Sequence, residues 1–257
     1  MHSPMFEVIS RANYAHHRAM NLAIDIGNTH TRMGVFAGES LVCNQMWEPG
    51  AIEQLADRYH PKRCGIACVG TCPETLEREL RQSGAEVVRI TGLTPTPLKM
   101  CYETPATLGA DRLAAAVGAW TLESGRPLLV IDCGTCVTFD YVSAAGEYMG
   151  GNISPGVFLR LKAMHEHTTL LPLVEPFGGY TSIGKSTAEA LQAGASMGVR
   201  REIEGYVESF LRENPEGHVF LTGGGLPEMD FAKGKDISIE KDLVLRGINA
   251  ILNETDS

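Results

Sequence analysis

No run of apolar residues in this 257-residue sequence approaches the roughly 20 that a membrane-spanning helix needs. The first twenty residues also lack the apolar core of about 7–15 residues that a secretory signal peptide carries. Positive charge is scarce: 22 Lys and Arg stand against 31 Asp and Glu, for a net charge of −9, and the basic residues are scattered. Because nucleic-acid binding requires a basic face, we expect neither a membrane nor a nucleic-acid partner.

The cysteines do not suggest a disulfide framework. There are seven, an odd number, and they fall within predicted strands and turns, which favours a reducing, cytoplasmic location. Cys133 and Cys136 form a CxxC pair, for which a redox or metal role is an alternative. Against that role, the pair lies in a predicted hairpin turn rather than at the start of a helix, and no second pair completes a zinc site.

One stretch of the sequence occurs twice. Residues 22–36 read LAIDIGNTHTRMGVF, and residues 129–143 read LVIDCGTCVTFDYVS. Each copy is an apolar strand ending in Asp, then a glycine turn with small hydroxyl residues, then a second predicted strand. A single copy could be an ordinary hairpin, but two copies predict a pair of phosphate-binding hairpins that face each other across one nucleotide. Five positions match at a constant offset of 107 residues: Leu22/Leu129, Ile24/Ile131, Asp25/Asp132, Gly27/Gly134 and Thr31/Thr138.

Residue types in the first copy suit a metal-bound triphosphate. Gly27 lets the backbone approach a phosphate closely, and Asn28, Thr29 and Thr31 offer hydrogen-bond donors. Asp25, at the end of the strand, suits Mg²⁺, which prefers carboxylate and phosphate oxygens.

The distribution of turn residues predicts an α/β fold in two similar halves. Residues 1–20 carry no periodic pattern and are interpreted as a disordered or extraneous extension, followed by halves at 21–124 and 125–257. The first half contains a strand meander over 21–47, helices at 51–60, 73–83 and 109–124, strands at 63–69 and 86–90, and a loop at 91–107. The second contains strands at 128–133, 137–142, 147–153 and 219–221, and helices at 155–165, 186–214 and 242–253.

A charged group stands at the head of an otherwise apolar helix, in Gly109-Ala110-Asp111-Arg112. Helix capping and dipole attraction alone could explain a carboxylate there. The functional alternative is that Asp111 accepts a proton from an alcohol while Arg112 holds an anion, which is what phosphoryl transfer requires.

Six blocks in order give the chain a resemblance to the type III pantothenate kinases, of the actin-like ATPase and sugar-kinase superfamily. The blocks are IDIGNT, Tyr102 with GADR, IDCGTCVTFD, GGNISPG, IGKSTAEALQAG and LTGG. The resemblance implies duplicated ribonuclease H-like domains, each a mixed sheet flanked by helices. It also implies ATP-dependent phosphorylation of the 4′-hydroxyl of pantothenate, the first step toward coenzyme A. Two positions depart from the family pattern: Cys136 stands where Ala is usual, and no acidic residue follows the second Gly of 222–225.

The resemblance also implies a role for individual residues. Asp111 is similar to the proton acceptor, and Thr135 to a second phosphate contact. Asp132 is similar to the ligand of a monovalent cation, K⁺ or NH₄⁺, required beside Mg²⁺. Thr187 matches a threonine that reaches the substrate's carboxylate in a site completed by the second subunit of a homodimer. The ATP phosphate loop is implied to be Asp25, Ile26, Gly27, Asn28, Thr29, His30, Thr31 and Arg32, and the pantothenate pocket to be Tyr102, Gly109, Ala110, Asp111 and Arg112.

Two alternatives to this kinase remain at the level of sequence. One is a non-catalytic nucleotide-binding regulatory factor on the same fold, which would have no reason to keep Asp111 with Arg112 beside it. The other is a different kinase or phosphatase of the superfamily, against which the GADR and IGKST blocks weigh.

Overall fold

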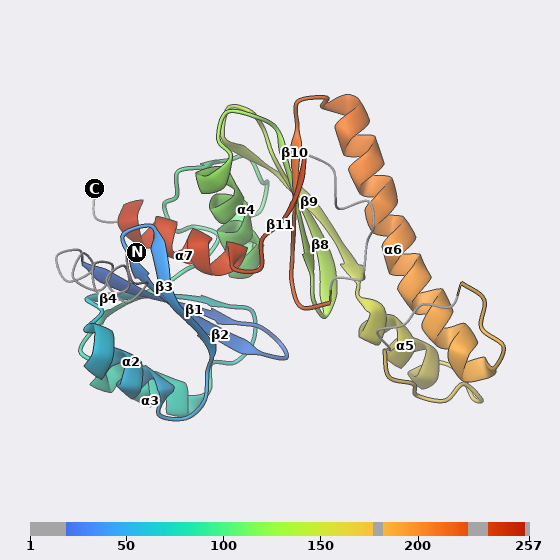
Figure 1. The fold of residues 1–257 in the computed structure, drawn as a ribbon, viewed down its shortest axis with the longest axis horizontal. Helices are drawn as coiled ribbons and strands as arrows, with labels where there is room; N and C mark the ends of the chain where they lie inside the picture. The colour runs from blue at the N-terminus through green and yellow to red at the C-terminus, as the bar shows by residue number, and fades with distance from the viewer. Residues whose placement is uncertain (1–18, 177–181, 226–235, 255–257) are drawn as a thin grey trace, which may run out of the picture. The chain divides into compact units, whose positions relative to one another are not determined.

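The computed structural model describes residues 19–176, 182–225 and 236–254. The chain forms two compact units that are not continuous in sequence (Figure 1). Within the described residues, the first comprises 19–97, 106–118 and 244–254, and the second comprises 98–105, 119–176, 182–225 and 236–243.

The first unit is built on a five-stranded mixed sheet with the order β3-β2-β1-β4-β5. Strands β1 to β3 form an antiparallel meander, and β4 and β5 continue the sheet parallel to β1. One face packs on helices α2 and α3, through a core that includes Ile24, Ile66, Ile52 and Leu76. The bounds are β1 Met20–Ile26, β2 Thr31–Ala37, β3 Ser40–Met46, α2 Ala51–Tyr59, β4 Arg63–Cys68, α3 Glu74–Gln82 and β5 Glu86–Arg89.

The other face of this sheet is covered by α7 (Leu243–Glu254), the last helix of the chain. Gly65 of β4 leaves room for it, because a Cβ at that position would lie 2.6 Å from the side chain of Ile248. Asn21 of β1 donates hydrogen bonds to the side chains of Asn249 (3.0 Å) and Asn253 (2.9 Å). The last helix of the second predicted half is therefore part of the first unit.

Helix α4 (Ala110–Leu122) packs against α7 through small residues. A Cβ on Gly247 would overlap the carbonyl oxygen of Ala114, so the two backbones touch where both helices lack large side chains. Only the part of α4 up to Gly118 belongs to the first unit.

The second unit contains a six-stranded sheet with the order β11-β10-β7-β8-β9-β6. The long helix α6 covers one face, through contacts of Val199, Ile203 and Val207 with strand residues such as Ile131 and Leu221. Helix α5 packs against α6, and Leu161 meets Leu191 and Ala195 there. The bounds are β6 Lys99–Met100, β7 Leu128–Cys133, β8 Cys136–Val142, β9 Glu147–Pro155, α5 Val157–Glu166, α6 Thr187–Glu213, β10 His218–Thr222 and β11 Ile237–Ile239, with a 3-10 turn at Pro105–Thr107.

The predicted duplication is confirmed by the strand order. Strands β9-β8-β7-β10-β11 repeat the order and directions of β3-β2-β1-β4-β5, with β6 added at one edge. The prediction of an α/β fold with duplicated mixed sheets is therefore correct, and the order is that of a ribonuclease H-like domain.

Some local predictions differ from the structure. Strand β6 lies inside the segment expected to be a loop over 91–107, because its residues are ordered by pairing with β9 rather than by a local pattern. Strand β11 was not expected for the same reason, since it is short and pairs only with β10. Residues 1–18 of the expected extension lie outside the described residues, and Met20 already begins β1. No helix within the described ranges has the length and apolarity needed to cross a membrane.

Candidate active site

The first repeated hairpin joins β1 to β2 through residues 27–30. The backbone N–H of Gly27 donates to the carbonyl of His30 at 3.0 Å and closes the turn. Asn28, Thr29 and His30 are exposed, while Asp25 is half-buried at the end of β1 opposite Arg32. The turn thus presents amide and hydroxyl donors to solvent beside one carboxylate, a combination suited to phosphate oxygens with an associated Mg²⁺.

The second repeated hairpin, between β7 and β8, has a turn shorter by one residue: Cys133 pairs with Val137, so the turn consists of residues 134–136. The N–H of Gly134 donates to the carbonyl of Cys136 at 2.9 Å. Thr138 pairs with Asp132, whereas its sequence counterpart Thr31 pairs with Ile26. The two copies therefore differ in register, because turn geometry rather than sequence offset sets the pairing of a hairpin.

Two glycine segments pack directly on this second turn. The N–H of Gly156 donates to the carbonyl of Thr135 at 3.0 Å, and the N–H of Gly225 donates to the carbonyl of Cys133 at 2.7 Å. A Cβ on Gly223 would overlap a carboxylate oxygen of Asp132 and the Cys133 carbonyl. A carboxylate and a backbone carbonyl thus lie together, and such oxygens suit a hard cation.

The GADR segment begins α4 in the first unit. Asp111 lies in the first turn, where its Oδ1 accepts a hydrogen bond from the backbone N–H of Arg112 at 2.8 Å. A Cβ on Gly109 would lie 2.5 Å from that same Oδ1, so the carboxylate occupies space that any other residue at 109 would take. The side chain of Arg112 and residue Ala110 are buried.

Burial alters the acidity of Asp111. It raises the pKa of this carboxyl above its ordinary value of 3.8, because removal from water disfavours the charged form. The hydrogen bond from the Arg112 N–H and the charge of Arg112 lower the pKa but do not cancel the effect of burial. A carboxylate of raised pKa is a stronger base, so this group is suited to accept a proton.

Tyr102 lies in the second unit, just after β6. Its ring meets the ring of Tyr148 edge to face, with centroids 6.0 Å apart and an interplanar angle of 72°. The residue before it, Cys101, donates its N–H to the carbonyl of Tyr148 at 3.0 Å. Tyr102 is half-buried, so part of its ring remains open to a ligand.

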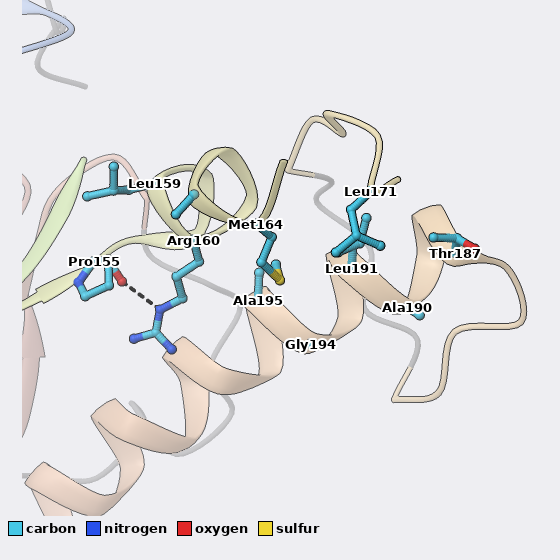
Figure 2. Close-up of a pocket in the computed structure, with 11 residues that line it drawn as sticks. Pro155, Leu159, Arg160, Met164, Leu171, Thr187, Ala190, Leu191, Gly194 and Ala195 are labelled. Atoms are coloured by element: carbon cyan, nitrogen blue, oxygen red, sulfur yellow. Dashed lines mark hydrogen bonds between the residues drawn. The ribbon is translucent and has the colours of Figure 1, made fainter. Parts of the chain in front are cut away.

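Thr187 is the first residue of α6, and the predicted helix start is confirmed. The hydroxyl of Ser186 accepts from the N–H of Glu189 at 3.2 Å, as an N-cap should. Thr187 lines a cavity of about 580 Å³ between α5 and α6, shown in Figure 2. Its lining residues all lie between 155 and 195, so Tyr102 does not share this cavity with Thr187.

The CxxC pair does not have the properties of a redox centre. The side chain of Cys133 points into the core of the second unit, and burial raises the pKa of its thiol far above the usual range. A thiol that resists ionisation is a poor nucleophile and a poor metal ligand. Among the described residues, no group of three or more His, Cys, Asp or Glu could hold a metal ion.

Some residues around these segments were not expected from the sequence. Gly156 and Gly223 lie in glycine-rich stretches that the sequence does show, but their closeness to the second hairpin depends on the fold. Tyr148 and Asp140, behind Tyr102, have no local signal, because each reads as an ordinary strand residue.

Comparisons with known proteins agree on one family. The family model described as type III pantothenate kinase matches residues 21–209. A type III pantothenate kinase of Bacteroides fragilis is 40% identical over 239 residues, covering 91% of this chain and 98% of the relative. One of Phocaeicola vulgatus is 40% identical over 242 residues, covering 92% and 99%.

A likeness to a solved structure supports the fold. A protein of Campylobacter jejuni described as a Baf family transcriptional activator has a TM-score of 0.54 at 21% identity, covering 91% of this chain and 98% of that one. At this identity the likeness concerns the fold alone. The match of the family model over most of the chain, together with relatives at 40% identity, shows that this protein belongs to the type III pantothenate kinase family.

Proposed function

We propose that this protein transfers the γ-phosphoryl group of ATP to the 4′-hydroxyl of pantothenate, the first step toward coenzyme A. The observation that carries the proposal is the half-buried Asp111 carboxylate of raised pKa at the start of α4, within a chain of this family. A phosphotransferase with an alcohol acceptor needs such a group to take the hydroxyl proton.

In the proposed reaction, the hydroxyl oxygen attacks the γ-phosphorus while Asp111 accepts its proton. The bond between the γ-phosphorus and the β,γ-bridging oxygen breaks, and ADP leaves. The hydrogen bond from the Arg112 N–H fixes one carboxylate oxygen, and the other is assigned to the proton.

The hairpin residues are assigned to the phosphates. Donors of residues 27–32, of which 28–30 are exposed, and the hydroxyl of Thr135 are assigned to phosphate oxygens. Asp25 fits Mg²⁺, which is commonly bound by one carboxylate together with substrate phosphates and water. Asp132, with the carbonyl of Cys133 nearby, fits K⁺ or NH₄⁺. When bound, the two ions neutralise phosphate charge.

Pantothenate is assigned to Tyr102, Gly109, Ala110 and Arg112, with Thr187 reaching its carboxylate. The separate cavity of Thr187 supports a homodimer in which each subunit supplies this threonine to its partner. Large apolar side chains on β9, on α5 and in the loops before α6 are also exposed, and we propose that a second copy covers some of them. They are Met149, Ile153, Phe158, Leu170, Leu173 and Ile183, of which Leu170 is 90% exposed and Ile183 77%.

The proposed location is the cytoplasm. All seven cysteines are described, and all are free thiols, as expected for a protein kept in a reducing compartment.

An assay of ADP release with pantothenate, MgATP and K⁺, against a control without pantothenate, tests the function. We expect turnover that depends on pantothenate and falls by about 10²–10⁴ in Asp111→Asn, the usual contribution of a positioned base. Nucleotide binding without any pantothenate-dependent turnover would instead support the non-catalytic regulatory alternative.

A further inference from the structure

Behind Tyr102 lies a buried pair of side chains to which the proposed reaction assigns no role. The hydroxyl of Tyr148, on β9, donates a hydrogen bond to Oδ1 of Asp140, on β8, at 2.6 Å. Both residues are 0% exposed. A distance of 2.6 Å is typical of a hydroxyl that donates to a carboxylate, which is stronger than a bond between neutral groups.

This pair is unusual for the interior of a sheet. A buried carboxylate is costly unless it is hydrogen-bonded, and an apolar side chain at either position would fill the same space without that cost. The bond does confer geometry: it fixes the position of the Tyr148 hydroxyl, and with it the direction in which the ring lies between the strands. Polar pairs of this kind rigidify what packs on them.

The residue that packs on this ring is Tyr102. The edge-to-face contact, with centroids 6.0 Å apart, joins it to Tyr148. On another side, a Cβ on Gly150 would come within 3.2 Å of Cδ2 of the Tyr102 ring. Gly150 has a φ of +110°, which favours glycine, so its backbone can pass close to the ring.

The backbone before Tyr102 is held by the same strand. Met100 pairs with Tyr148 in the parallel β6–β9 ladder, and Lys99 forms a 2.7 Å ion pair with Glu147. Strand β9 therefore anchors both the main chain that precedes Tyr102 and the ring of Tyr102 itself.

We propose that Tyr148 and Asp140 are positioning residues for Tyr102, and that through it they set the affinity for the alcohol substrate. This inference rests on the proposed function, which assigns Tyr102 to pantothenate. Neither residue touches the substrate: Asp140 orients Tyr148, and the edge of Tyr148 orients the ring of Tyr102.

Steady-state kinetics of Tyr148→Phe in the full-length protein test this role. The variant keeps the ring and removes only the hydroxyl that binds Asp140. We expect the KM for pantothenate to rise about two- to tenfold, with complete loss of the aromatic contact as the upper limit, while the KM for ATP stays within about twofold. A structural defect alone would instead lower the active fraction, and with it kcat, without selecting one substrate.

A matched control is Tyr141→Phe. This tyrosine belongs to the same sheet, but its ring packs against Phe210 of α6 with centroids 6.1 Å apart. Removal of the Tyr141 hydroxyl should leave the KM for pantothenate and the KM for ATP at their native values. Asp140→Asn, which keeps an oxygen acceptor, should restore most of the affinity that Asp140→Ala loses.

A double-mutant cycle shows whether the effect runs through Tyr102. In a Tyr102→Ala background, Tyr148→Phe should no longer change the KM for pantothenate. If it still raises that KM, or if folded Tyr148→Phe has the native KM in the native background, the positioning role is overturned.

If the Tyr148→Phe protein does not fold, a second variant tests the same inference. Gly150→Ala crowds the Tyr102 ring without touching the hydrogen bond, and it should raise the same KM. A native KM in folded Gly150→Ala would overturn the inference. Absence of pantothenate-dependent turnover in the native protein would defeat the proposed function itself, which distinguishes the two failures.

Discussion

Gly223, at the end of β10, lies so close to Asp132 that a Cβ at position 223 would overlap an oxygen of the Asp132 carboxylate. The same Cβ would overlap the carbonyl of Cys133, and Gly223 has a φ of +95°. The glycine therefore meets two requirements at once: a left-handed backbone and a close approach to the turn between β7 and β8.

Replacement of Gly223 by alanine should consequently be costly. The overlap with backbone cannot be relieved by a side-chain rotation, and the positive φ adds strain. We expect a loss of about 1–3 kcal/mol in the free energy of unfolding, measured by urea titration. Gly224→Ala is the matched control, because no atom lies within 4 Å of a Cβ at position 224, and it should stay within about 0.5 kcal/mol of native. Equal stability of the two variants would contradict this packing.

Gly109→Ala should separate activity from stability. Its Cβ would lie 2.5 Å from Oδ1 of Asp111, but that oxygen is the end of a side chain and can turn away. We expect an unchanged melting temperature and a kcat lower by about 10–10²-fold, because the base is displaced. Gly205→Ala, on α6 and without neighbours within 4 Å, is the control and should keep the native kcat. A native kcat in Gly109→Ala would show that the orientation of this carboxylate is unimportant.

The raised pKa of Asp111 predicts a pH dependence of stability. The folded state favours the protonated carboxyl. The stability that Asp111 contributes is therefore complete below pH 3.8, its ordinary pKa, and is lost as pH rises through the pKa of the folded state. Asp111→Asn cannot ionise, and its melting temperature relative to the native protein should therefore increase with pH across this window. The acid limb of the native kcat/KM profile should also lie above pH 3.8, since the base must be ionised to act. A melting-temperature difference that is constant or falls with pH would contradict the assignment.

The cation assignment predicts an ion preference that depends on Asp132. Replacing K⁺ by Na⁺ should lower native activity by at least about fivefold, the equivalent of roughly 1 kcal/mol of interaction. Asp132→Ala should have no such preference, because the ligand is gone. Asp57→Ala, at an exposed position of α2, should keep it. If the native enzyme is equally active with K⁺ and with Na⁺, the assignment of a monovalent cation to Asp132 is wrong.

Local signals in the sequence were sufficient for much of the fold. Ser186, a residue type common at helix N-caps, marks the start of α6, and in the structure its hydroxyl accepts a hydrogen bond from the N–H of Glu189. The matching strand–glycine–strand segments around Asp25 and Asp132 predicted the duplication, which the strand orders confirm. Asp111 at the head of an apolar helix was visible as a charged group in an unusual place. In each case the pattern reports an interaction between near neighbours in the chain.

Other features depended on tertiary structure. The one-residue difference in register between the two hairpins is invisible in their alignment, because it follows from the length of each turn. Helix α7 packs on the first sheet, through Asn249 against Asn21, more than two hundred residues earlier in the chain. The bond between Tyr148 and Asp140 joins two residues that read as ordinary strand positions. Periodicity and capping determined which segments are helices and strands, since those are local preferences. Only packing decided which distant side chains meet, because that depends on how whole elements bury their apolar faces against one another.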